Sequence, residues 1–162
     1  MVQLIPFDKL LPSQLMDLAN LLNFDDTLRD ELGFKAEDPP MSALDFQAFT
    51  QAWAERTQSL QFVIANGGGI AMGLISLSHI NKENGDARCG YWIGSKYRNR
   101  GYTKEAFEKI INIARQMELK FLTSTISPNN DISLAIWAKY RPMVEKVKGS
   151  LRVTVDLWKE SD

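Results

Sequence analysis

Cysteine, histidine and long apolar runs are scarce in this chain of 162 residues, and each shortage excludes a class of protein. Cysteine occurs once, at Cys89, so no disulfide can form within the chain, as in a reducing compartment. Cys89 lies in an apolar stretch, which favours a buried, unreactive thiol. No group of His, Cys, Asp and Glu has the spacing of a metal site. No apolar run approaches the ~20 residues that cross a bilayer and no signal peptide is visible, so we expect a cytoplasmic protein without a membrane partner.

An excess of charge of one sign is also lacking. Lys and Arg number 19 and Asp and Glu 20, so charge alone predicts no nucleic-acid partner. The run Gly67–Gly69 does not continue into a dinucleotide motif, because Met72 stands where the third glycine belongs and no helix follows. The length and an apolar content of 44% fit one globular domain over residues 1–162.

Hydrophobic periodicity predicts an alternation of strands and helices. We expect strands over 2–7, 61–65, 70–80, 87–93, 121–126, 143–148 and 151–158, and helices after Ser13, after Ser42, over 101–118 and over 132–140. This order indicates an α/β (α+β) fold with a mixed, mostly antiparallel central sheet, flanking helices and one β-α-β crossover with parallel strands over 87–126.

Two segments of the first half leave a choice of interpretation. Phe46, Phe49 and Trp53 share one helix face, and a place in the core is favoured over an aromatic substrate box. The polar, acidic segment 23–40, which ends at a Pro-Pro pair, is either a solvated loop or a surface that attracts a cationic amine.

Basic residues crowd the start of the strongest predicted helix. They are Lys96, Arg98, Arg100 and Lys104. Cations are unfavourable at a helix N-terminus, whereas its free N–H groups bind anions, and Gly101 permits a close approach of the backbone. A diphosphate is the ligand that such a site would bind. The alternative interpretation of the segment is a solvated basic loop.

The same segment resembles the pyrophosphate-binding pattern Gln/Arg-x-x-Gly-x-Gly/Ala of the GNAT superfamily of N-acetyltransferases. Arg98 and Gly101 match the pattern, and Thr103 departs from it. Together with the stretch 90–94, it is similar to the branch of ribosomal-protein N-terminal and spermidine acetyltransferases (the RimJ/RimL-like group). The resemblance implies acetyl-CoA as cosubstrate, no metal, and a set of residues that hold the coenzyme. That set is Trp92, Ile93, Gly94, Arg98, Asn99, Arg100, Gly101, Tyr102, Thr103, Asn130 and Ser133.

The resemblance also implies an acid and a base that this chain lacks at the usual positions. Trp137 stands where many members have a phenol, and Arg88 stands where many have a glutamate. The catalytic groups are therefore unassigned. Asp86, His79 and Ser133 are the candidates, and for His79 a structural or surface role is favoured.

The acceptor and the assembly stay open at this point. The acceptor implied is a primary amine: a protein N-terminus, a polyamine or another small amine. The alternative is a CoA-binding sensor or interaction module without transferase activity. Trp158 on the last predicted strand either covers a partner in a homodimer or packs on its own chain.

Overall fold

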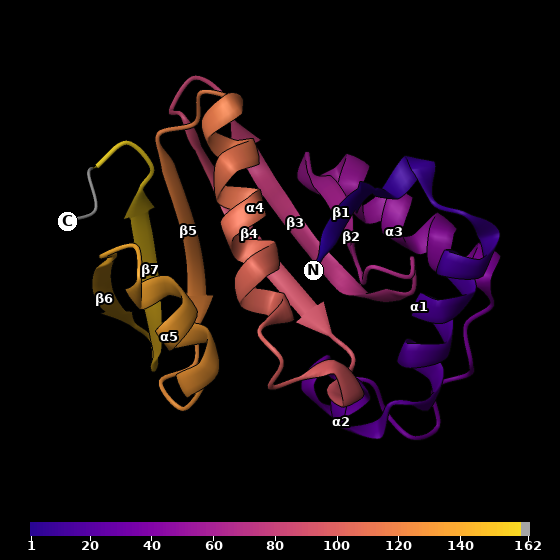
Figure 1. The fold of residues 1–162 in the computed structure, drawn as a ribbon. Coiled ribbons are helices and arrows are strands. Elements are labelled where there is room, and N and C mark those ends of the chain that lie inside the picture. The colour runs from indigo at the N-terminus through magenta and orange to yellow at the C-terminus, as the bar shows by residue number, and fades with distance from the viewer. Residues whose placement is uncertain (160–162) are drawn as a thin grey trace.

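The computed structural model describes residues 1–159, and its elements follow the predicted order (Figure 1). The strands are β1 (Gln3–Pro6), β2 (Leu60–Ala65), β3 (Ala71–Asn81), β4 (Asp86–Ile93), β5 (Phe121–Ile126), β6 (Met143–Val147) and β7 (Ser150–Asp156). The α-helices are α1 (Pro12–Phe24), α2 (Asp26–Glu31), α3 (Ala43–Thr57), α4 (Tyr102–Gln116) and α5 (Asp131–Ala138). Two short 3-10 turns, η1 (Phe7–Lys9) and η2 (Ser95–Tyr97), follow β1 and β4.

The seven strands form one sheet in the order β1-β2-β3-β4-β5-β7-β6. All neighbours pair antiparallel except β4 and β5, which are parallel and are joined through α4. The expected mixed, mostly antiparallel sheet with one parallel step is therefore confirmed. The edge place of β1 also suits Pro6, which has no N–H to donate to a second neighbour.

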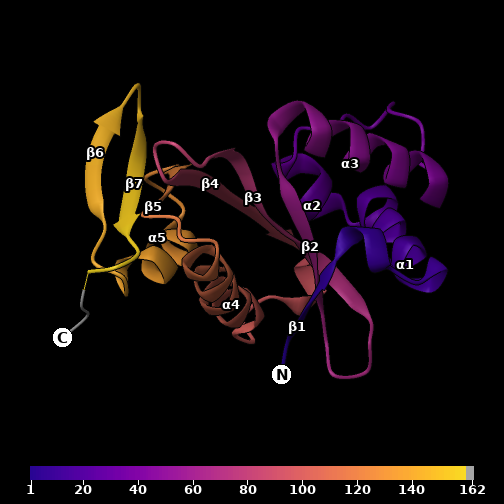
Figure 2. The same cartoon turned by 90° about the horizontal axis from the view of Figure 1, so that it is seen from above.

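The helices cover both faces of the sheet, with α4 and α5 on one side and α1 to α3 on the other (Figure 2). On the first side, α4 buries an apolar stripe that includes Phe107 and Ile110, and α5 buries Trp137. On the second side, Leu18 of α1 and Phe46 of α3 pack together over β2 and β3. Side chains alternate along β4. Ala87 and Cys89 lie on the α4 side, so Arg88 between them faces the α1–α3 side.

Cys89 is buried, as predicted, and burial raises the pKa of its thiol far above the usual value. Trp158 is 60% exposed, and its Nε1 donates to the carbonyl of Leu119 at 2.8 Å. A homodimer through this face stays a prediction. None of the helices within residues 1–159 is long and apolar enough to cross a membrane.

The interpretation of the acidic segment as a loop is wrong for part of it, because the segment contains α2. The Asp25 carboxylate accepts the N–H of Leu28 at the start of this helix, and Leu28 is buried under α1 and α3. A side-chain cap and one buried residue are enough for a helix this short when the rest of the protein holds it in place.

The core assignment of the α3 aromatic residues is confirmed for Phe46 and wrong for Phe49, which is 61% exposed. The helix buries only Phe46 and Thr50, which lie four residues apart on one stripe. Phe49 lies beside that stripe, because three residues turn a helix by less than one full revolution.

Candidate active site

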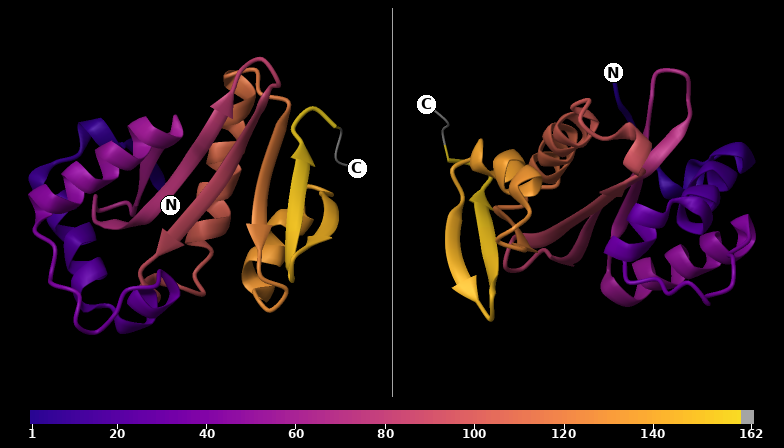
Figure 3. Two further views of the ribbon diagram at one scale, coloured as in Figure 1. Left: turned by 180° about the vertical axis from the view of Figure 1, so that it is seen from behind. Right: turned by 90° about the horizontal axis from the view of Figure 1, so that it is seen from below.

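The two parallel strands at the centre of the sheet separate halfway along their length. Their register ends at the pair Arg88 and Thr123, although β4 continues to Ile93 and β5 to Ile126. Figure 3 shows the two strands diverging towards their C-terminal ends. The N–H of Gly94 donates to Met72 of β3 at 2.9 Å.

The orientation of that bond identifies which groups of β4 lie at the open edge. The backbone groups of successive residues point to alternate edges of a strand. Those of Tyr91 and Ile93 therefore point away from β3, where β4 has no strand partner within residues 1–159. Such an edge can bind an extended ligand in the manner of an added strand.

The open edge leads to the N-terminus of α4. The residue before this helix is Gly101, in the left-handed conformation with φ 81°, and no side chain caps the helix. The first N–H groups of a helix have no partner within it and attract anions. A Cβ atom built at Gly101 would meet no atom within 4 Å, so the space directly beside this residue is open. Arg100 and Lys104 are exposed on either side.

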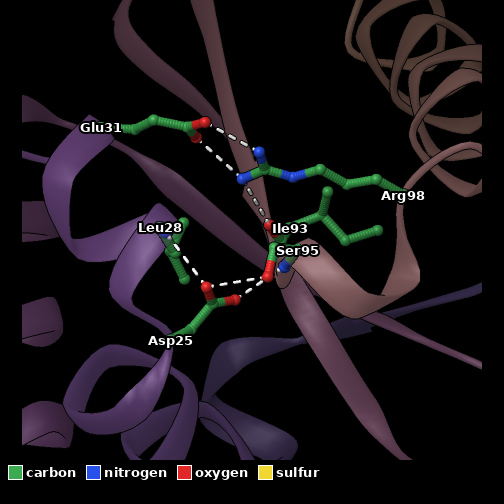
Figure 4. Close-up of polar contacts among 6 residues, drawn as sticks. All are labelled: Asp25, Leu28, Glu31, Ile93, Ser95 and Arg98. Atoms are coloured by element: carbon green, nitrogen blue, oxygen red, sulfur yellow. Dashed lines mark hydrogen bonds and ion pairs between the residues drawn. The ribbon is translucent and has the colours of Figure 1, made fainter.

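Arg98, the first residue of the predicted pyrophosphate pattern, points elsewhere (Figure 4). Its two terminal nitrogens donate to the two carboxylate oxygens of Glu31 at 2.8 Å each, and one also donates to the carbonyl of Ile93 at 3.2 Å. Its backbone N–H donates to the backbone carbonyl of Ser95 at 3.3 Å. Arg98 therefore fastens α2 to the loop after β4, and the N–H groups of residues 99–104 are those left for an anion.

Asp25 makes a second connection between α2 and this loop (Figure 4). Its carboxylate accepts the N–H of Ser95 at 2.7 Å and the Ser95 hydroxyl at 2.9 Å, besides the N–H of Leu28 at 3.1 Å. Partial burial opposes ionisation, but these hydrogen bonds and the charge of Arg98 outweigh it and lower the pKa of Asp25. The acidic segment thus supports the site through specific contacts.

Two hydroxyl groups meet beside the open edge, on its α4–α5 side. The Tyr91 phenol lies 2.8 Å from Oγ of Ser133, a buried residue of α5 whose own N–H donates to the Asn130 cap at 3.2 Å. Burial raises the pKa of Tyr91, against the opposing effect of Ser133, so the phenol stays protonated at neutral pH. Nε1 of the fully buried Trp137 has no hydrogen-bond partner in the described chain.

Sequence analysis predicted Ser133 but missed Tyr91. The available signal was a hydroxyl group on a strand face that otherwise carries the apolar side chains of Ala87, Cys89 and Ile93.

A cavity of about 370 Å³ lies on the opposite, α1–α3 side of the same stretch of β4. Gly90, Tyr91 and Trp92 line it from the strand, at the point where β4 has left β5. Phe49 and Trp53 of α3 line it as well, and an aromatic substrate box at these residues stays a prediction. The cavity and the open edge thus share the residues 90–92.

The other candidate catalytic residues lie apart from this site. Asp86 is at the far end of β4, in the part that still pairs with β5. His79 is exposed near the end of β3 with φ 50°, beside a surface depression shared with Arg56 and Lys82. Neither residue lines the cavity, and their roles stay predictions. Within residues 1–159, no cluster of His, Cys, Asp and Glu could hold a metal ion.

Comparison with known proteins gives one family match and many similar folds. The family model described as an acetyltransferase (GNAT) domain matches residues 10–141. No curated protein sequence matches the chain.

Among solved structures, a spermidine N-acetyltransferase from Vibrio cholerae, in complex with CoA and spermine, has a TM-score of 0.73 at 15% identity, covering 96% of this chain and 95% of that one. RimL, a ribosomal alpha-N-protein acetyltransferase in complex with CoA, has a TM-score of 0.73 at 14% identity, covering 96% and 93%. A candidate ribosomal-protein-serine acetyltransferase from Vibrio cholerae has a TM-score of 0.72 at 20% identity, covering 96% of this chain and 93% of that one. At these identities the likeness shows a shared fold.

Proposed function

Because the chain belongs to the acetyltransferase (GNAT) family, we propose that it transfers an acetyl group from acetyl-CoA to a primary amine by direct attack. The observation that carries this proposal is the unpaired edge of β4 beyond Arg88. This edge lies beside the cavity and leads to the open N-terminus of α4. The pantetheine arm of acetyl-CoA carries amides that can pair with such an edge as an added strand.

The anionic end of acetyl-CoA fits the start of α4. The free N–H groups of residues 99–104, with the helix dipole behind them, suit a diphosphate, and Arg100 and Lys104 add positive charge. Arg98 contributes by holding the loop in place through Glu31 and Ile93.

The reaction requires one bond to form, one to break and two protons to be placed. The neutral amine attacks the thioester carbonyl carbon, so a C–N bond forms and the C–S bond breaks. The amine proton goes to solvent, because no carboxylate lines the cavity. We assign protonation of the leaving thiolate to the Tyr91 phenol, which Ser133 orients by its hydrogen bond. Because both substrates are held side by side at residues 90–92, their proximity raises the reaction rate by a large factor.

A CoA-binding module without transferase activity is the second candidate. Trp137 favours it, because a buried indole stands where the family resemblance places a proton-donating phenol.

The two candidates are separated by turnover. We expect a purified sample with acetyl-CoA and a panel of primary amines to release CoA thiol, measured with a chromogenic disulfide reagent, and to form the N-acetyl product, measured by mass spectrometry. Samples without amine and without protein are the controls. Thermal stabilisation by acetyl-CoA without thiol release from any amine would favour the binding module, and no stabilisation would contradict both candidates.

A further inference from the structure

The cavity beside β4 is apolar, and its lining residues carry no charge. Apolar side chains contribute most of its wall, and those that matter here are Phe34, Phe46, Phe49, Trp53, Leu74 and Trp92. The polar side chains in the lining are neutral: Thr50, Gln61 and Ser76. An apolar pocket with a few neutral polar groups is typical of a small-molecule site and suits an apolar ligand group.

Along β4, the cationic side chain nearest to the cavity is that of Arg88. Alternation places Arg88 on the same face of β4 as Gly90 and Trp92, about 7 Å along the strand from Gly90. Arg88 is exposed. A substrate with several ammonium groups would thus meet a like charge at the edge of the cavity and no carboxylate within it.

Because no carboxylate lines the cavity, the site also favours acceptor amines that have a low pKa. Only the neutral amine attacks, and an uncharged, apolar cavity has no group to accept its proton. The α-amino group at the N-terminus of a peptide has a pKa near 7.8 and an alkylamine such as lysine near 10.4, so at pH 8 the peptide α-amine is about 150-fold richer in the neutral form. Desolvation in an apolar cavity lowers both values and preserves this order.

On the premise of the acetyltransferase function above, we propose that the acceptor is the α-amino group of an aromatic residue at the N-terminus of a peptide. The aromatic ring fills the cavity between α3 and β4, and the amine lies at residues 90–92, where the open edge meets the cavity. The volume of about 370 Å³ holds one aromatic residue with its amine. A polyamine does not fit this chemistry.

The test compares four amines at pH 8 with saturating acetyl-CoA and measures initial rates of thiol release. Phenylalaninamide has the ring and the α-amine, alaninamide lacks the ring, spermidine lacks both, and a peptide with N-terminal phenylalanine represents the proposed acceptor. We expect kcat/KM for phenylalaninamide to exceed that for alaninamide and spermidine by about 100-fold or more, since a single methylene in an apolar pocket is already worth 10–200-fold.

Phe49→Asp provides a second, independent measurement. Phe49 is 61% exposed, so its replacement leaves the fold intact while placing a carboxylate in the cavity wall. We expect kcat/KM for phenylalaninamide to fall at least 10-fold while spermidine gains, with the acetyl-CoA-induced rise in Tm unchanged. Leu44→Asp is the matched control, because it adds the same charge to the same helix at a residue that is 74% exposed and does not line the cavity.

The outcomes separate this inference from the function on which it rests. Robust turnover with spermidine or alaninamide preferred would overturn the acceptor class and leave the acetyltransferase standing. An unchanged preference in Phe49→Asp would overturn the placement of the ring. Turnover with none of the amines would overturn both.

Discussion

Replacing Gly101 by tryptophan should abolish coenzyme binding at a predictable cost in stability. Gly101 has φ 81°, and a residue with a Cβ in this region costs roughly 1–2 kcal/mol. No atom lies within 4 Å of a Cβ built there, so in the free protein the Cβ of either alanine or tryptophan meets no clash. For a domain of this size, both variants should lose about 2–8 °C in Tm.

Ligand then distinguishes the two variants. Acetyl-CoA at a hundred times its dissociation constant stabilises by about 2.7 kcal/mol, which raises the Tm of the wild type by roughly 5–10 °C. Gly101→Ala should keep most of this rise, because a methyl group leaves the N–H groups of α4 accessible. Gly101→Trp should lose it, because the indole fills the open space before the helix.

The assay is thermal unfolding followed by fluorescence or calorimetry, with each protein measured with and without acetyl-CoA. Retention of the full rise by Gly101→Trp would refute the placement of the diphosphate at α4. Loss of the rise in Gly101→Ala alongside Gly101→Trp would show that the backbone conformation matters and the open space does not.

Three further predictions concern the acid, the core and the acidic segment. Tyr91→Phe should lower kcat by about 100-fold, because it removes the proposed proton donor, while the acetyl-CoA-induced rise in Tm is retained; an unchanged kcat would exclude that role. Phe107→Ala should cost about 3–5 kcal/mol, measured by urea unfolding, since the side chain is fully buried between Tyr91 and Trp137; a loss below 1 kcal/mol would contradict that packing. The pKa of Asp25 is lower folded than unfolded, so its stabilisation is present above the usual value of 3.8 and is lost as pH falls through the folded value. The Tm difference between wild type and Asp25→Asn should therefore shrink below pH 3.8, and a constant difference would contradict the assignment.

Local patterns in the sequence determined the elements and much of the candidate site. The apolar stripe of α4, the alternation along β7 and the turn at Gly67–Gly69 each depend on neighbours within a few residues, so they can be recognised without the fold. The glycine before α4 was recognisable in the same way, because a basic segment followed by glycine and an amphipathic helix predicts an anion site.

Only the tertiary structure decided what the site contains and what surrounds it. The Tyr91–Ser133 pair spans 42 residues and the Asp25–Ser95 pair spans 70, so no local pattern records either contact. The separation of β4 from β5 and the cavity between α3 and β4 depend on how whole layers pack. Periodicity reports which face of an element is buried, but the partner of that face is chosen by the summed packing of distant segments, and so Phe49 became a cavity wall instead of core.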